Sequence, residues 1–123
     1  MARMHERIGR VLLVEANVDA REAMTAFLEV EGYDVVGAAN GQDALVHLRA
    51  SPIFCVILLD LGTPAMDGWE FWAEHVREPA TASVPVVIMS LEGLLAQRDG
   101  AMAVVSPGPV EWKHLLETVQ HHC

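Results

Sequence analysis

The apolar residues of the chain gather in five short runs, and a longer segment of mixed polarity separates each run from the next. Runs of this length are too short to cross a membrane. Because they are rich in branched side chains, they are typical of strands that are buried on both faces of a sheet. The predicted strands are residues 11–14, 33–38, 55–60, 86–89 and 102–105.

The segments between the runs repeat their apolar positions with the period of an α-helix. In the first segment Met24 and Leu28 share one face, and Gly32 follows the last turn, as glycine does at many helix ends. A further short helix is predicted at residues 92–98. The inward positions of the predicted helices are Ala20, Ala23, Met24, Phe27 and Leu28, then Ala44, Leu45 and Leu48, then Trp69, Trp72, Ala73 and Val76, and last Trp112, Leu115, Leu116 and Val119.

Strands and helices therefore alternate along the whole chain. Connections this short require right-handed crossovers, which produce a parallel sheet with helices on both faces. The sequence predicts one α/β domain, a (βα)5 doubly wound parallel five-stranded sheet spanning residues 10–120, with tails at 1–9 and 121–123. A chain of 123 residues with 52% hydrophobic residues is long enough to bury a core of its own.

The net charge of −9 sets limits on the partners. Binding to phosphate groups needs a basic patch, and the eight lysines and arginines are scattered singly, so we expect no direct nucleic-acid partner and no membrane partner. The first residues carry basic side chains without the apolar core of a signal peptide. These features predict a cytoplasmic protein.

The two cysteines are Cys55, in a predicted strand, and Cys123. Their spacing is not typical of a secreted disulfide framework, so we expect reduced thiols, with Cys55 as a buried thiol. His121 and His122 next to Cys123, with His114 nearby, suggest a metal site. Adjacent ligands in a tail lack supporting contacts, so we expect a solvated tail instead.

Asp60 ends the central apolar run and is followed by Gly62, Pro64 and Gly68. Open parallel sheets bind ligands in the loops beyond the carboxyl ends of their strands, so this position predicts a functional site. The alternative is an acid that caps the strand by accepting N–H bonds from its own loop. Four of the five predicted strands are followed or ended by a polar residue, namely Glu15, Asp60, Ser90 and Ser106.

These strand ends resemble those of the receiver domain of two-component response regulators. The matching stretches are RVLLVEAN, VDAREAMTAFLEVEGYDVV, AANGQDALVHL, ILLDLGTPAMDGWEF, VPVVIMS and VVSP. They extend from about Arg10 to Gln120, and the stretch around Asp60 is the most specific. The resemblance implies a flavodoxin-like receiver fold and a place in a phosphorelay.

The resemblance also implies roles for individual residues. Asp60 is the phospho-acceptor for a histidine kinase, and Ser90 is the hydroxyl that contacts the phosphoryl group and one of the switch positions. Glu15, Asp60 and the backbone carbonyl of Gly62 are the magnesium ligands. Such a metal is needed because phosphoryl transfer depends on positioning and on neutralisation of charge.

The chain departs from the family at several working positions. Ala16 occupies the place of the second acid, Ser106 takes the place of the lysine that contacts the phosphoryl group, and Ala103 replaces the aromatic switch residue. Pro107 follows as the candidate cis-proline. We therefore expect a degenerate receiver with a magnesium site that is weak or absent. It would act as an interaction module for a histidine kinase or a downstream output protein. Formation of a homodimer is a further option.

Other interpretations remain. One is a working receiver, phosphorylated on Asp60 with low efficiency. Separately, Asn17 could supply an amide oxygen in place of the missing acid, although it stands one position too late. An aspartate-nucleophile phosphohydrolase of the haloacid dehalogenase type needs a second acid where Gly62 stands, so we expect no enzyme. A flavin site lacks its Ser/Thr-rich phosphate loop. Trp112 is expected in the core, and if it is exposed it marks a partner surface.

Overall fold

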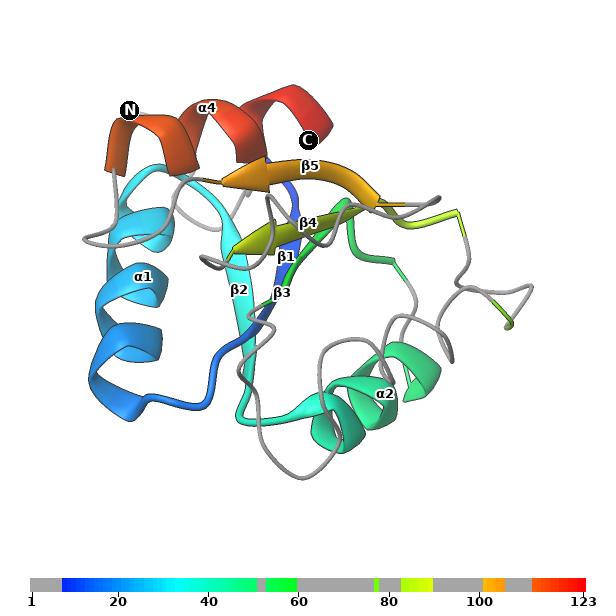
Figure 1. Cartoon of the computed structure of the whole chain (residues 1–123). Helices are drawn as coiled ribbons and strands as arrows, with labels where there is room; N and C mark the ends of the chain where they lie inside the picture. Colours follow the sequence, from blue (N-terminus) through cyan, green and yellow to red (C-terminus); the bar gives the residue numbers. More distant parts are fainter. Residues whose placement is uncertain (1–7, 51–52, 60–76, 78–82, 90–100, 106–111) are drawn as a thin grey trace.

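The computed structural model describes residues 8–50, 53–59, 77, 83–89, 101–105 and 112–123, in which strands and helices are arranged as one sheet with helices around it (Figure 1). The strands are β1 (Arg10–Val14), β2 (Asp34–Ala38), β3 (Val56–Leu59), β4 (Val86–Met89) and β5 (Ala101–Val105). The helices are α1 (Val18–Val30), α2 (Gly41–Ala50) and α4 (Trp112–His122).

The five strands form one sheet in the order β2-β1-β3-β4-β5, and every neighbouring pair is parallel. The chain adds β2 on one side of β1 and then returns to add β3 on the other side. This reversal is the topological switch point of a doubly wound sheet, and ligands bind beside it in such folds. The predicted fold class is confirmed, including its flavodoxin-like strand order.

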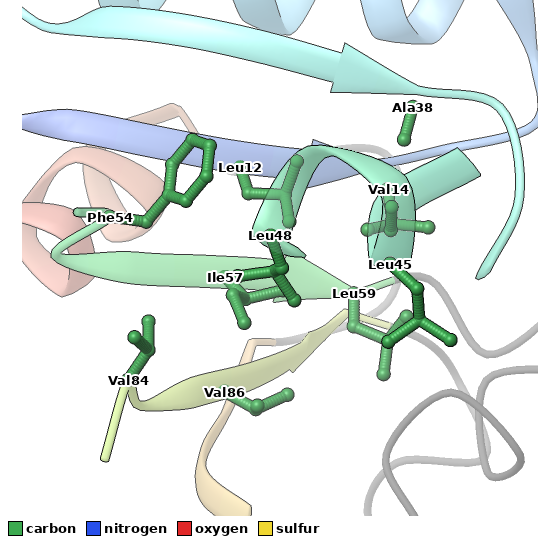
Figure 2. Packing of buried hydrophobic residues seen from close by; sticks show 11 residues of the cluster. Leu12, Val14, Ala38, Leu45, Leu48, Phe54, Ile57, Leu59, Val84 and Val86 are labelled. Carbon is green, nitrogen blue, oxygen red and sulfur yellow. The ribbon is translucent and has the colours of Figure 1, made fainter. Parts of the chain in front are cut away.

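Alternate residues of each strand face opposite sides of the sheet, and both sides are covered. Leu12, Val14, Ile57 and Leu59 point to the side of α2, where they pack into a buried cluster. Figure 2 shows Leu45 and Leu48 of α2 among the members of this cluster. The other members are Ala38, Ala44, Phe54, Val84 and Val86.

The opposite side of the sheet is covered by α1 and α4. Its buried cluster contains Met24 and Leu28 of α1 together with Leu115 and Val119 of α4. The strands contribute Val11, Leu13, Val56, Leu58 and Val87, and Tyr33 completes the cluster. Because both faces are covered, the central strands carry apolar residues at successive positions instead of alternating with polar ones.

The five strands and the three described helices agree with the predicted elements to within a few residues. The inward positions of α2 are confirmed, and Gly32 follows α1 with a φ of 104°, a left-handed conformation that glycine adopts without strain. Ala23 was predicted to face inward and is exposed. The helices predicted at residues 69–76 and 92–98 lie entirely outside the described residues.

Trp112 corrects a second expectation. It was expected in the core, but its side chain is 39% exposed. Its ring lies beside that of Phe27, with 4.8 Å between the ring centroids. The first turn of α4 therefore presents an aromatic ring to solvent while Leu115 and Val119, further along the same helix, are buried.

The prediction of reduced thiols is wrong, because Cys55 and Cys123 form a disulfide. Residues 121–123 are also not a free tail. Helix α4 continues to His122, and the N–H of Cys123 donates to the carbonyl of Val119 at 2.9 Å. The pairing is invisible in the sequence because 68 positions separate the two cysteines, and only the folded sheet brings the start of β3 beside the end of α4.

Within the described residues, none of the helices is long and apolar enough to cross a lipid bilayer.

Candidate functional site

The carboxyl ends of the strands lie at matching levels along one edge of the sheet. Val14 of β1 pairs with Leu59 of β3, and Leu59 pairs in turn with Ile88 of β4. Met89, the last residue of β4, pairs with Val105, the last residue of β5. Neighbouring strands are about 4.8 Å apart, so this register places four strand ends in a row along the edge.

Each strand end is followed by one of the predicted site residues. Glu15 comes directly after β1, Asp60 after β3, Ser90 after β4 and Ser106 after β5. Of these, Glu15 lies within the described residues. Asp60, Gly62, Ser90, Ser106 and Pro107 lie outside them, and the predicted roles of these residues in phosphate or metal binding stay predictions.

Glu15 is held at the edge of the sheet by its backbone and its side chain. Its N–H donates to the carbonyl of Ala38 at 2.9 Å, which continues the bonding between β1 and β2 by one residue. The carboxylate oxygen Oε2 accepts a bond from the N–H of Asn17 at 3.1 Å. The side chain is half-buried, so a carboxylate is present at the switch point, as the sequence predicts.

Ala16 follows Glu15 and is also half-buried. Its methyl group cannot donate or accept a hydrogen bond and cannot bind a metal. The loop between β1 and α1 therefore offers one side-chain carboxylate before the helix begins.

Asn17 is the N-cap of α1. Its Oδ1 accepts a bond from the N–H of Ala20 at 2.8 Å, and its φ and ψ of −75° and 119° are the extended values usual at this position. The same oxygen was considered as a substitute metal ligand. Since it is engaged in capping, Asn17 would have to share it between the helix and the metal.

Arg21 is a residue of this edge that the sequence analysis missed. Its Nη1 donates to the backbone carbonyl of Glu15 at 2.7 Å. The aliphatic part of the Arg21 side chain passes over Gly37 of β2. A Cβ added at Gly37 would lie 3.1 Å from the Cδ of Arg21. A cation in the first turn of a helix opposes the helix dipole, which is the one hint in the sequence that Arg21 has a partner outside α1.

Ala103 lies within β5, where it pairs with Val87. The register of β4 against β5 shifts between Val86 and Val87, directly before this pair. At the predicted switch position the chain thus carries a methyl group, which has no ring to move between an inward and an outward orientation.

Comparison with known proteins identifies relatives of this arrangement. The response regulator receiver domain family matches residues 11–106. Protein PilH of Pseudomonas aeruginosa is 26% identical, and the match covers 91% of this chain and 95% of PilH. The transcriptional regulatory protein YxdJ of Bacillus subtilis is 32% identical over 82% of this chain, which corresponds to 42% of the length of YxdJ.

Solved structures show the same fold. The chemotaxis response regulator CheY4 of Vibrio cholerae superimposes with a TM-score of 0.84 at 27% identity, covering 94% of this chain and 98% of CheY4. The receiver domain of the sensor histidine kinase PA1611 of Pseudomonas aeruginosa, solved with a magnesium ion in its active-site cleft, gives a TM-score of 0.83 at 24% identity. That match covers 93% of this chain and 96% of the PA1611 domain.

Proposed function

The chain belongs to the response regulator receiver domain family of two-component signalling, and from this premise we propose that it is a degenerate receiver, a folded interaction module whose state depends little on phosphorylation of Asp60. The observation that carries the proposal is Ala16. It follows Glu15 in the β1–α1 loop, at the position where the family has the second acid that binds magnesium.

The loss of this acid weakens the metal site. Magnesium keeps a strict set of oxygen ligands and exchanges its water molecules reluctantly, so it depends on the few carboxylates that a protein provides. Disturbing even residues that only support metal ligands lowers affinity by roughly 10- to 100-fold. We expect at least this loss from the alanine, with Glu15, Asp60 and the carbonyl of Gly62 as the remaining ligands.

The serine at position 106 weakens the contact to a phosphoryl group. A hydrogen bond to a charged group contributes about 1.5 to 3 kcal/mol, and serine offers a neutral hydroxyl in place of the ammonium group. Ser90 and Ser106 would still contact the phosphoryl oxygens as hydroxyl donors. The losses at Ala16 and Ser106 act on the same step, so phosphorylation of Asp60 becomes slower and the phosphorylated state less favoured.

The two replacements leave the formal charge of the site unchanged, because one acid and one base are absent together. Glu15 and Asp60 can therefore remain at the same edge without a metal ion between them. Arg21 adds a cation that is bonded to the carbonyl of Glu15 at 2.7 Å. This balance supports a site that is stable in its unmodified state.

Protein binding is then the main activity, with a histidine kinase or a downstream output protein as the partner. Trp112 supports this role, because a tryptophan that is 39% exposed beside Phe27 is the kind of residue that anchors an interface. A homodimer through the same ring would also use this surface. The proposal includes a cytoplasmic location, no direct binding of nucleic acid or membrane, and no enzymatic activity of its own.

A second candidate is a working receiver with low efficiency. It is favoured by the residue types at four sequence positions that the receiver chemistry uses, namely Asp60, Glu15, Gly62 and Ser90. The two candidates differ in the extent of phosphorylation and in its consequence. An aspartate-nucleophile phosphohydrolase is a more distant third, since Gly62 cannot act as a general acid.

A phosphorylation assay distinguishes these candidates. The chain is incubated with acetyl phosphate and magnesium, and phosphoprotein is separated on a phosphate-retarding gel. The comparison is with the double variant Ala16→Asp, Ser106→Lys, and Asp60→Ala is the blank for both. We expect at least about a 10-fold higher initial rate in the double variant. Equal rates in the two proteins, both abolished by Asp60→Ala, would contradict the degenerate receiver and establish the working one.

A further inference from the structure

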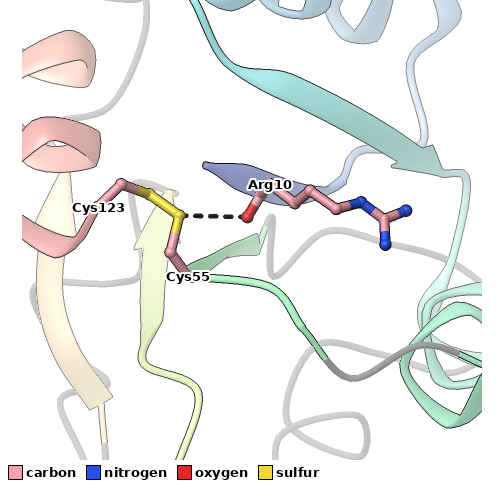
Figure 3. The surroundings of a disulfide bond; sticks show 3 residues. All are labelled: Arg10, Cys55 and Cys123. Atoms are coloured by element: carbon pink, nitrogen blue, oxygen red, sulfur yellow. Dashed lines mark hydrogen bonds between the residues drawn. A yellow bond between two sulfur atoms is a disulfide. The ribbon is translucent and has the colours of Figure 1, made fainter. Parts of the chain in front are cut away.

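The disulfide joins two elements that are distant in the chain. Cys55 directly precedes β3, and Cys123 directly follows α4 (Figure 3). Their Cα atoms are 5.3 Å apart, within the usual range for a disulfide. Both residues are half-buried and pack against the cluster between the sheet and the helices α1 and α4.

The surroundings of Cys55 suit a free thiol as well as a disulfide. Its N–H donates to the carbonyl of Arg10 at 2.9 Å, and its Sγ lies 3.2 Å from the same oxygen. At this distance the S–H of a reduced Cys55 donates a hydrogen bond to Arg10. Opening the disulfide therefore leaves the Cys55 thiol with an acceptor already in place, and the reduced protein need not rearrange β1 or β3.

Gly9 leaves room for the two sulfur atoms. A Cβ at this position would lie 2.8 Å from the Sγ of Cys55 and 3.5 Å from the Sγ of Cys123. The backbone of Gly9 is fixed next to β2, because its carbonyl accepts a bond from the N–H of Asp34 at 2.9 Å. A residue larger than glycine would press directly on the disulfide.

The bond acts on the last turn of α4. Noncovalent packing holds this helix through Leu115 and Val119, and the disulfide adds a covalent attachment at its end. The N–H of Cys123 also donates to the carbonyl of Val119, so tethering Cys123 restrains the turn that contains Val119. Without the bond, this turn is the part of α4 most able to open locally.

We propose that Cys55 and Cys123 form a reversible redox site that exchanges with a dithiol of the thioredoxin class, and that the oxidised state fixes the end of α4 on the sheet. Disulfides of cytosolic proteins are usually transient and sense redox conditions, so the expected location favours a reversible bond over a permanent one. The site lies at the amino ends of the strands, on the edge of the sheet opposite to Glu15, and the inference does not depend on phosphorylation.

The exchange is a balanced two-electron reaction. A thiolate of the dithiol attacks one sulfur, the bond between the two Sγ atoms breaks, and the other cysteine leaves as a thiolate and takes up a proton. The second thiol of the partner then resolves the mixed disulfide. The partner ends as a disulfide, and Cys55 and Cys123 end as two thiols.

A dithiol resolves the mixed disulfide with its own second thiol, whereas glutathione needs a second molecule for that step. We therefore expect reduced thioredoxin to open the bond and glutathione at the same thiol concentration to open it much less.

The test uses the full chain, first oxidised and then treated with reduced thioredoxin, with its reductase and NADPH, or with glutathione. Alkylation by a maleimide of high mass reports the number of free thiols, and amide hydrogen exchange reports the opening of residues 115–123. We expect no labelling before treatment, two labels after thioredoxin, and at least about a 10-fold faster exchange in residues 115–123 with α2 unchanged.

Four variants serve as controls. Cys55→Ser and Cys123→Ser should show the fast exchange of residues 115–123 under both conditions. Gly9→Ala should shift the thiol–disulfide equilibrium toward the reduced form, because a reduced Cys55 side chain is free to rotate away from the new Cβ and the disulfide is not. Gly37→Ala, away from the sulfur atoms, should not shift it. Two free thiols in the oxidised sample, resistance of the bond to thioredoxin, or equal exchange before and after reduction would each overturn the proposal.

Discussion

At the scale of single residues, the loop after β1 is held by a few polar contacts. Asn17 caps α1, its N–H binds the Glu15 carboxylate, and Arg21 binds the Glu15 carbonyl. These bonds fix the one described carboxylate of the candidate site before any ligand arrives. Ala16 stands in the middle of this loop and contributes none of them.

The cap of α1 gives a first prediction. Asn17→Ala removes the oxygen that accepts from the N–H of Ala20, and loss of such a cap costs about 1 kcal/mol of unfolding free energy. Asn40→Ala is the matched variant, because its Oδ1 accepts from the N–H of Asp43 at the start of α2. Urea unfolding checks both. A change close to zero for Asn17→Ala would show that its oxygen is not capping the helix.

Tyr33 gives a second prediction, on pH. The residue is 1% exposed, and its burial, together with the charge of Glu31, raises the pKa of its phenol above the usual 10.0. The phenol therefore ionises at a lower pH in the unfolded chain than in the folded protein. Its contribution to the free energy of unfolding is fully present below pH 10.0 and is lost as the pH rises above that value. Since the chain has one tyrosine, absorbance follows its titration directly.

Tyr33→Phe is the control for this titration. Without the phenol, the unfolding free energy of this variant should decrease less above pH 10.0 than that of the natural sequence. Urea unfolding on either side of pH 10.0 measures the difference. An absorbance titration that matches free tyrosine in the folded protein would contradict the prediction.

Residues whose environment is set by local periodicity were predictable. Met24, Leu28 and Leu48 are buried as their helical spacing indicates. The exposure of Trp112 was not predictable, because it depends on which side chains of another element lie beside the ring, here Phe27 of α1. Arg21 and Cys123 were missed for a similar reason, since their partners come from other elements. The residues after β3, β4 and β5 remain predictions.

At the scale of elements, helix ends decide where the chain can turn toward the next strand. Gly32 ends α1 with a positive φ, and its carbonyl accepts a bond from the N–H of Ile8 at 2.8 Å. A Cβ at this glycine would also come 3.0 Å from the side chain of Ile8. The exit of α1 is therefore tied to the residues just before β1.

Substitution of Gly32 tests this junction. Gly32→Ala should lower the unfolding free energy by about 1 kcal/mol or more, because alanine is strained at positive φ. Gly32→Asn should cost less, since asparagine adopts this conformation more readily. Thermal and urea unfolding measure both. An equal cost for the two variants would mean that crowding against Ile8, and not the backbone, sets the penalty.

At the scale of the whole molecule, the fold follows from alternating buried strands and amphipathic helices, and this is why the sequence predicted it well. The register that aligns Val14, Leu59 and Ile88 at one edge is a consequence of this pattern. The disulfide at the opposite edge of the sheet does not follow from this pattern. It needs Cys55 and Cys123 to meet in space, which no periodicity indicates.

The disulfide should also matter for global stability. It closes a loop of 68 positions, and in the chain-entropy description a loop of this size stabilises the folded state by roughly 4 kcal/mol. Reduction should lower the unfolding free energy by about this amount. Urea unfolding with and without reductant measures it, with Cys55→Ser as a control that reductant leaves unchanged. Equal stabilities with and without reductant would contradict this prediction.

The most direct measurement for the central claim is the binding of beryllofluoride, a phosphoryl mimic, in the presence of magnesium. Amide NMR shifts of Glu15, Asp60, Ser90 and Ser106 report the binding, and Asp60→Ala is the control. We predict no saturable, magnesium-dependent shifts at millimolar ligand. Saturable shifts that need magnesium and disappear in Asp60→Ala would contradict the degenerate receiver and show that the chain is a phosphorylation switch.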